Sequence, residues 1–141
     1  MFKVLMSVVM FLLFNIATLS QGMIISKENA DELFGQVIVS IQIPSTELNT
    51  FATQSSDVLM FNILNNELYI LDNKRNTLKP LGVTVNSTET FSVYSVEIVK
   101  KLLTDGNSTI TYIEKRNEVL TMTNGIFTLE YSSFCPPYCP D

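Results

Sequence analysis

The dipeptide Asn124-Gly125 constrains the fold more than any other feature, because it separates two runs in which apolar and polar residues alternate. Asn-Gly favours a two-residue type I′ turn, which requires a positive φ at both central residues. Such a turn places Met122 opposite Phe127 in the paired strands. We therefore expect a β-hairpin spanning residues 118–131, with one covered face and one mostly solvated face.

The two faces of this hairpin differ in chemistry. The face expected to be covered carries Leu120, Met122, Phe127, Leu129 and Tyr131. The face expected to be solvated carries Val119, Thr121, Thr123, Ile126, Thr128 and Glu130. One-sided burial of this kind is typical of an antiparallel sheet that packs on a core.

Further strand signals lie in both halves of the chain. Asn65-Asn66 separates a second pair of apolar runs and is a weaker form of the same turn signal. These runs predict a hairpin over residues 57–72. Apolar and β-branched segments predict additional strands at 36–43, 78–85, 91–94 and 108–114.

Two helices are predicted, one in each half of the chain. Ser26 and Ser95 are the expected N-caps, because a serine hydroxyl accepts a hydrogen bond from an otherwise unpaired amide of the first turn. Gly35 and Gly106 are the expected C-terminal stops. Apolar residues at helical spacing follow each serine, so one stripe of each helix is expected to face the core.

The order helix, strand, hairpin therefore occurs twice. It indicates an α+β fold in a single small domain, built as two αβββ units over residues 26–72 and 95–131 with helices packed on one face of an antiparallel sheet. The first unit is longer, and we interpret residues 44–56 as a connection within it. The alternative is that any α+β chain shows a coincidence of this kind.

The N-terminus has the pattern of an export signal. Lys3 precedes an apolar run over residues 4–14, which is shorter than the ~20 residues needed to span a bilayer and is followed by small residues. We expect residues 1–20 to be a cleaved signal peptide, which leaves a domain at 21–133, a tail at 134–141 and no stable membrane anchor. The expected location is secreted or periplasmic, and an uncleaved anchor is the alternative.

The composition argues against several classes of protein. With no histidine in 141 residues, the chain lacks imidazole acid–base catalysts, imidazole metal ligands and Ser-His-Asp triads. A net charge of −5, with 9 Lys and Arg residues, is opposite to the basic surface that binds nucleic acids. We therefore expect no enzyme activity, no cofactor, no metal site and no nucleic-acid partner.

The C-terminal tail is the most unusual segment, because both cysteines of the chain, Cys135 and Cys139, lie in it. In an exported protein this pair is expected to form a disulfide, which requires the residues between them to turn. The candidate binding residues of the tail are Phe134, at the base of this ring, and Pro136, Pro137 and Tyr138 within it. The alternative is a functional dithiol that takes part in thiol–disulfide exchange or holds a soft metal such as copper.

Export, the lack of catalytic groups and a constrained aromatic tail together favour a small binding module, protein-binding or inhibitory, whose partner is an unknown exported protein. Exposed edge strands also leave room for a homodimer. A third interpretation is a small-molecule or glycan binder that uses a sheet face. Its candidate contacts are Asn62, Tyr69, Thr121 and Thr128.

In architecture alone, tandem helix-plus-sheet units such as those expected at 26–72 and 95–131 resemble the β-lactamase-inhibitor-like and PepSY-like groups of exported proteins. Members of these groups tend to bind or inhibit other proteins. The resemblance implies a binding role and transfers no functional residue to this chain.

Overall fold

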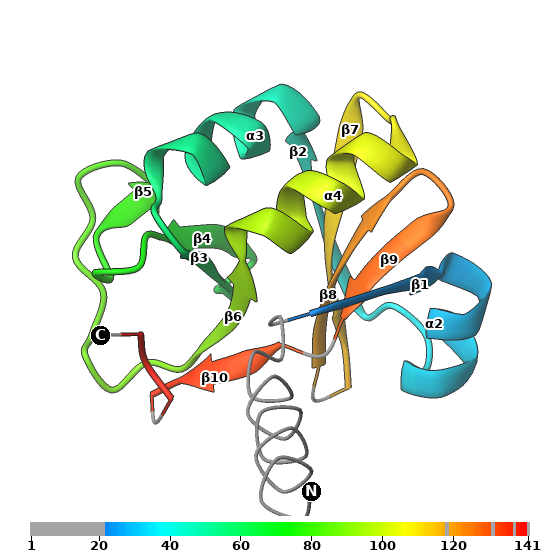
Figure 1. Cartoon of the computed structure of the whole chain (residues 1–141). Coiled ribbons are helices and arrows are strands. Elements are labelled where there is room, and N and C mark those ends of the chain that lie inside the picture. Colours follow the sequence, from blue (N-terminus) through cyan, green and yellow to red (C-terminus); the bar gives the residue numbers. More distant parts are fainter. Residues whose placement is uncertain (1–21, 118, 131, 137, 141) are drawn as a thin grey trace, which may run out of the picture.

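A computed structural model describes residues 22–117, 119–130, 132–136 and 138–140. Within these residues the chain forms three helices and ten strands, and the strands make up two antiparallel sheets of five strands each (Figure 1). The structure confirms the predicted α+β class and the single small domain. The predicted signal peptide, residues 1–20, lies outside the described residues.

Each sheet contains strands from both halves of the chain. Sheet A has the order β1 (Met23–Ser26), β9 (Phe127–Glu130), β8 (Val119–Asn124), β7 (Ile110–Arg116) and β2 (Val39–Pro44). Sheet B has the order β10 (Ser133–Cys135), β6 (Phe91–Ser95), β3 (Val58–Leu64), β4 (Glu67–Leu71) and β5 (Thr77–Lys79).

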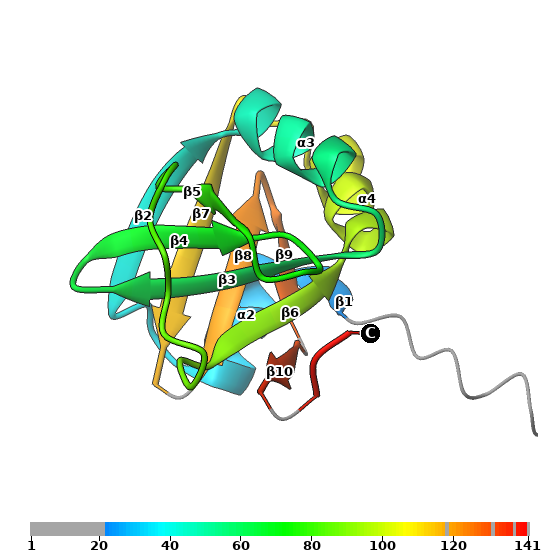
Figure 2. The ribbon, with the colours of Figure 1, turned by 90° about the vertical axis from the view of Figure 1, so that its left-hand side faces the viewer.

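The helices occupy two places in the fold. The helices α3 (Ser45–Gln54) and α4 (Val96–Gly106) lie side by side across one end of the two sheets, as Figures 1 and 2 show. The helix α2 (Lys27–Phe34) packs on the outer face of sheet A. None of the helices in the described ranges is long and apolar enough to cross a membrane.

The main core lies between the inner faces of the two sheets and beneath α3 and α4. Its fully buried residues include Ile43, Leu59, Phe61, Ile70, Tyr94, Leu102, Ile113, Met122 and Leu129. The Tyr94 hydroxyl group donates a 2.6 Å hydrogen bond to the backbone oxygen of Leu120 and so joins sheet B to sheet A. Burial raises the pKa of Tyr94, which keeps the phenol protonated and able to donate.

An internal two-fold relation between two βαβββ units explains the topology. The first unit is β2–α3–β3–β4–β5 and the second is β6–α4–β7–β8–β9. The last three strands of each unit form a meander, and its first strand pairs with the meander of the other unit. Thus β2 pairs with β7, and β6 pairs with β3. The strands β1 and β10 are additions beside β9 and β6.

Backbone hydrogen bonds support this relation at the level of single residues. The Ser45 amide, at the start of α3, donates to the backbone oxygen of Thr109 at 2.9 Å. The Val96 amide, at the start of α4, donates to the backbone oxygen of Asp57 at 2.8 Å. Each bond joins the first residue of a helix to the residue that precedes the paired strand of the other unit, so the two bonds are equivalent.

Residues 44–56 were expected to be a connection, and this expectation is wrong because they contain α3. The buried side chains of α3, Leu48 and Ala52, are one turn apart and pack on the core. Most other residues of the helix are Ser, Thr or Asn, which favour caps and turns over helix interiors. Packing therefore decides this helix. The two units β2–β5 and β6–β9 also differ from the predicted halves 26–72 and 95–131, because α3 and not α2 is equivalent to α4.

The serine caps of the other two helices are confirmed, whereas Gly106 is the last residue of α4 and the left-handed C-cap is Asn107, with a φ of 50°. The Ser26 hydroxyl accepts from the Asn29 amide and the Ser95 hydroxyl accepts from the Ile98 amide, each at 3.2 Å. The helix α2 ends at Gly35, which has a φ of 81°. These signals act within one helical turn, so the sequence alone was sufficient to find them.

The Asn65-Asn66 hairpin is confirmed as well. Both residues have positive φ, 51° and 63°, as a type I′ turn requires. The strand expected at 78–85 is limited to β5, since Pro80 has no amide hydrogen with which to continue the ladder.

The predicted register of the other hairpin is wrong. Asn124 belongs to β8 and faces Phe127, so Met122 faces Leu129 instead of Phe127. Because the partner changes by two residues, the side chains keep their predicted faces. Gly125 is the first residue of the turn and has a φ of 60°.

The side-chain amide of Asn124 is the physical cause of this shift. It is fully buried and donates to Thr111 Oγ1 at 2.9 Å and to Ser45 Oγ at 3.0 Å. Its oxygen accepts a 2.9 Å hydrogen bond from the Ser108 amide. At a turn position the side chain would lose these bonds and leave its partners unpaired, so Asn124 stays in the strand.

Gly125 and Gly82 provide a matched pair of substitutions. Both have positive φ, 60° and 80°, so alanine meets a similar backbone penalty of ~1–2 kcal/mol at each. A Cβ atom at Gly125 would lie 2.6 Å from the backbone oxygen of Gly106, whereas at Gly82 it would meet nothing within 4 Å. We expect Gly125→Ala to lower the free energy of unfolding in urea by ~1–3 kcal/mol more than Gly82→Ala. Equal losses would contradict the close packing of this turn on α4.

Candidate functional site

The C-terminal tail is fixed to sheet B as its edge strand. In the β10–β6 pair, Phe134 faces Ser92 and Cys135 faces Phe91. Side chains alternate along a strand, so Phe134 lies on the inner face of sheet B and Cys135 on the outer face. The two candidate residues are therefore on opposite sides of the sheet.

Cys135 and Cys139 form a disulfide, with their Cα atoms 4.5 Å apart. The Tyr138 amide donates a 2.9 Å hydrogen bond to the backbone oxygen of Phe134, which closes the expected turn. Cys139 is exposed, but Cys135 is fully buried in a second apolar cluster on the outer face of sheet B. The other fully or almost fully buried members of this cluster are Val58, Met60, Leu71, Phe91 and Val93.

The guanidinium group of Arg75 holds the ring in place from the β4–β5 connection. Its Nη1 atom donates to both the backbone oxygen and the Sγ atom of Cys135, each at 3.2 Å. Its Nη2 atom donates to the backbone oxygen of Glu89 at 3.1 Å, and the group lies 5.3 Å from the centre of the Phe91 ring. The tail is thus tied to two loops as well as to β6. The sulfur of Cys135 is buried and Cys139 is exposed, so the alternative of a reactive dithiol stays a prediction.

The tail presents two aromatic side chains to solvent. Phe134 is 41% exposed and Tyr138 is 71% exposed. Pro136 is half-buried, and Pro137 lies outside the described residues. Tyr138 therefore lies at the surface of the covalently closed ring and Phe134 lies directly before it in β10, and the role of both residues in binding stays a prediction.

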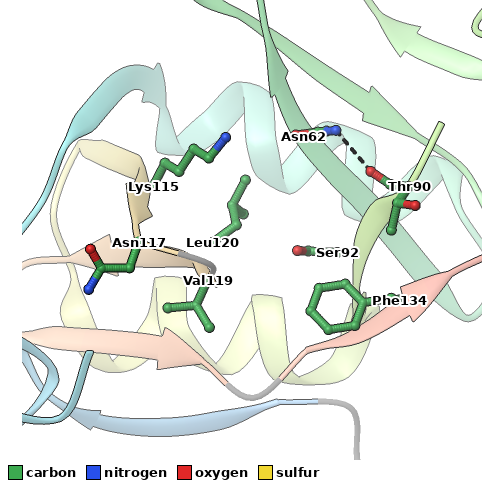
Figure 3. Close-up of a pocket in the computed structure, with 8 residues that line it drawn as sticks. All are labelled: Asn62, Thr90, Ser92, Lys115, Asn117, Val119, Leu120 and Phe134. Carbon is green, nitrogen blue, oxygen red and sulfur yellow. Dashed lines mark hydrogen bonds between the residues drawn. The ribbon is translucent and has the colours of Figure 1, made fainter. Parts of the chain in front are cut away.

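A pocket of about 260 Å³ lies next to Phe134, at the end of the inter-sheet space away from α3 and α4 (Figure 3). We call it the tail pocket. It is lined by Asn62, Thr90, Ser92, Lys115, Asn117, Val119, Leu120 and Phe134. In Figure 3, Lys115 and Asn117 lie across from Asn62, Thr90 and Ser92, with Phe134 on the side of β6.

The tail pocket combines apolar and polar groups. Leu120, Val119 and Phe134 supply apolar surface, and among the described lining residues Lys115 carries the only charge. The Asn62 side chain is engaged in the fold, since its Nδ2 atom donates to the backbone oxygen of Thr90 at 2.8 Å. This lining suits a partner that offers one aromatic or aliphatic group and one hydrogen-bonding or acidic group.

The outer face of sheet A was expected to be mostly solvated, and this expectation is wrong for four of its residues. Thr121, Thr123, Thr128 and Glu130 are buried or almost fully buried. The helix α2 covers this face, and its Ala30 side chain is fully buried there. The sequence showed the alternation of the strands but not the position of the helix that covers them.

Arg116, which the sequence analysis did not single out, is the centre of a polar network under α2. Although none of its surface is exposed, it donates from Nε to Thr121 at 3.1 Å and from Nη2 to Glu114 at 3.0 Å. Its Nη1 atom binds Asp31 of α2 and the backbone oxygen of Gly35. The Arg116 hydrogen bond lowers the pKa of Asp31, which keeps this carboxylate charged. The signal that could have found this network is the two-residue spacing of Glu114 and Arg116 on one strand face.

Glu130 is a second buried carboxylate on the same face. Burial raises its pKa to about 7, while the charge of Arg116 acts in the opposite direction. Neither of its carboxylate oxygens has a hydrogen-bond partner within the described part of the chain. The nearby Thr123 hydroxyl is used elsewhere, since it donates to Glu114 at 2.8 Å. We assign this cluster to holding α2 on sheet A.

The contacts suggested for a small-molecule or glycan binder do not come together. Thr121 and Thr128 are buried under α2, Tyr69 packs against the cluster around Cys135, and Asn62 lines the tail pocket. Within the described ranges, no group of three or more Asp, Glu, Cys or His side chains could hold a metal ion.

Comparisons of the chain with protein-family models, with curated proteins and with solved structures found no match. The case for a function therefore rests on the chain's own residues, and the architectural resemblance to exported inhibitor-like domains stays a prediction.

A comparison of Cys139→Ala with Cys135→Ala separates the effect of opening the ring from the effect of losing the buried sulfur atom of Cys135. Both substitutions open the disulfide, but only Cys135→Ala removes a buried atom that Arg75 contacts. We expect Cys135→Ala to lower the free energy of unfolding by ~1–2 kcal/mol more than Cys139→Ala. Urea denaturation measures both values, and a larger loss for Cys139→Ala would contradict the burial of Cys135.

The raised pKa of the Glu130 carboxyl group leads us to predict that the stability of the fold depends on pH. The pKa of its carboxyl group rises from 4.5 to about 7, so the folded state keeps a proton that the unfolded chain releases in this interval. Stability therefore falls as the pH rises through the interval. We expect Glu130→Gln to be more stable than the wild type at about pH 8, by up to ~3 kcal/mol, and to vary less with pH.

Denaturation in urea at a series of pH values measures this effect. The exposed residue Glu97 on α4 supplies the control substitution Glu97→Gln, which is expected to leave the pH dependence unchanged. The same slope in the wild type and in Glu130→Gln would show that Glu130 is ionised in the folded state.

Proposed function

We infer that the mature chain is an exported, non-enzymatic protein-binding module, and that its contact surface consists of Phe134, Tyr138 and the tail pocket. The observation that carries this proposal is that two exposed aromatic side chains are held in place, Tyr138 by the ring closed by Cys135 and Cys139 and Phe134 by the pairing of β10 with β6. Aromatic side chains dominate the energetics of many protein interfaces. Holding them rigid before binding lowers the entropy lost on association.

The proposed export has two supports. Residues 1–20 have the charge and apolar pattern of a signal peptide. The chain also forms a disulfide, and structural disulfides persist mainly in secreted and periplasmic compartments. A secreted or periplasmic location follows from these two features together.

The ring itself limits what kind of contact the tail can make. Cys135 is buried and Arg75 is already bound to it, so the tail cannot move into a partner as a flexible arm. The partner must therefore approach a surface whose shape is set before binding. We expect fast, rigid docking in which Tyr138 is inserted into a pocket of the partner.

Substitutions in the tail test the proposal. We expect Phe134→Ala and Tyr138→Ala to weaken partner binding at least about tenfold each, since each removes an exposed aromatic group from the proposed contact surface. The matched control is Ile126→Ala, which removes an apolar side chain that is 72% exposed in the β8–β9 turn, far from the tail.

The measurement is capture of proteins from the exported fraction of the native host on the immobilised mature domain, followed by affinity determination for the captured protein. A partner retained by Ile126→Ala and lost by both tail variants supports the proposal. A partner retained equally by all three variants would overturn the tail as the contact surface.

A further inference from the structure

We propose that the free edge of β2, with the groove beside it, binds an extended segment of a partner protein that carries an aromatic residue at its centre. The segment is added as an antiparallel strand. This site is separate from the tail surface, and its argument comes from the internal two-fold relation of the fold. In the second unit, β10 occupies the edge of β6 that is equivalent to the free edge of β2.

The strands β2 and β6 are equivalent in the two units, and only β6 has a neighbour on its outer edge. In sheet B, β10 pairs with β6. In sheet A, β2 is the last strand, and within the described residues no strand pairs with its outer edge. Figure 2 shows β2 at the side of the molecule opposite β1.

The backbone of β2 offers hydrogen-bonding groups at this edge. The Ser45 amide donates to the backbone oxygen of Thr109, next to β7. Successive amide groups of a strand point in alternate directions, so the amides of Ile43 and Ile41 also point towards β7. The amide groups of Ser40 and Gln42 consequently point away from the sheet.

The residues of β6 that are equivalent to Ser40 and Gln42 are the ones that pair with β10. Phe91 and Val93 occupy the places of Ser40 and Gln42, and they pair with Cys135 and Ser133. The outer edges of β2 and β6 therefore present the same pattern of backbone donors and acceptors. At β6 this pattern is satisfied by the chain's own strand β10.

The groove beside β2 shares equivalent lining positions on its first strand and on its meander with the tail pocket, and α3 and β5 add walls that the tail pocket does not have. It has a volume of about 460 Å³ and lies between β2, α3, β4 and β5. Ile41 and Leu68 line the groove, and their equivalents Ser92 and Leu120 line the tail pocket. The equivalence follows from register, because Ile41 faces Ile113 in one pair of strands as Ser92 faces Phe61 in the other.

This correspondence fixes where the partner's central side chain points. Phe134 faces Ser92 and enters the space next to the tail pocket, so a residue that faces Ile41 enters the groove. The groove is the more apolar of the two, with Phe51, Leu78 and Leu81 on its walls. An aromatic side chain fits this lining and would cover Leu81, which is 88% exposed.

The charged side chains around the edge of β2 and the groove indicate which charge the partner segment carries. Residues 36–44, which contain β2, carry no charged side chain, so the edge lacks the lysines that natural proteins use to keep strands apart. Glu67 is exposed on the rim of the groove, and Glu47 pairs with Lys79 there at 2.8 Å. A lysine or arginine beside the aromatic residue of the partner would complement Glu67.

A second copy of the chain fits less well than a partner segment. Two copies paired through β2 would place Ile41 against Ile41 and could extend sheet A. The Ile41 side chain of each copy would then take the place that Phe134 takes on β6, and isoleucine is smaller than an aromatic residue and fills less of a groove of about 460 Å³. An added segment with its own aromatic residue satisfies both the edge and the groove.

The probe for this site is a peptide with the sequence of residues 131–136 in which serine replaces the cysteine, acetyl-Tyr-Ser-Ser-Phe-Ser-Pro-amide. It reproduces the strand that binds the equivalent edge. Titration into the ¹⁵N-labelled mature protein is expected to shift the amide signals of Ser40 and Gln42 and to slow their hydrogen exchange. A peptide with serine in place of phenylalanine is expected to bind at least tenfold more weakly.

Gln42→Pro and Gln42→Ala are the matched variants. The Gln42 amide points outward and its side chain is exposed, so proline removes one edge donor without breaking the β2–β7 ladder. We expect Gln42→Pro to weaken peptide binding at least tenfold and Gln42→Ala to stay within twofold of the wild type. Leu81→Ser, on the exposed rim, is expected to weaken it at least threefold without a risk to folding.

Three results would overturn the proposal. The first is equal binding of the peptide by Gln42→Pro, Leu81→Ser and the wild type. The second is a set of shifted signals confined to β6 and the tail, which would mean that the peptide displaces β10. The third is a wild-type dimer in sedimentation that Gln42→Pro converts to a monomer, which would assign the edge to a second copy. Gln42→Pro leaves Tyr138 intact, so this site and the tail surface can fail independently.

Discussion

The exchange of first strands between the two units is the constraint on which the rest of this fold depends. Because β2 is paired along β7 and β6 along β3, each sheet is completed by a strand from the other half of the chain. The same exchange brings α3 and α4 side by side and closes one common core beneath them (Figure 1). Neither half could cover the inner face of its own meander, so the two halves form one domain around a shared main core.

The parts of the fold that the sequence predicted correctly depend on neighbours within a few residues. The serine caps at Ser26 and Ser95 and the turn at Asn65-Asn66 are of this kind. The helix α3 and the register at Asn124 were missed because distant residues decide them. Leu48 and Ala52 form a helix only against the core, and Asn124 stays in β8 because Ser45, far along the chain, accepts its hydrogen bond.

The features of the candidate site also fall into those that the sequence predicted and those that it did not. The spacing of Cys135 and Cys139 was enough to expect a bridge, since the chemistry of the pair is local. The depth at which Cys135 is buried was not predictable, because Arg75 reaches it from a turn on another strand pair. The buried network around Arg116 was hidden for the same reason: its strand looks half-solvated until α2 is placed over it.

The exchanged strands also set the order in which the chain can fold as it is made. The strand β2 is synthesised early, but its partner β7 follows only after β3 to β6 and α4. Pairs so far apart along the chain close slowly, because the long intervening loop must first lose its freedom. The first half therefore stays open until most of the second half has emerged. For a protein that must thread unfolded through a translocation channel, as proposed for this chain, such a delay keeps the polypeptide competent for transport.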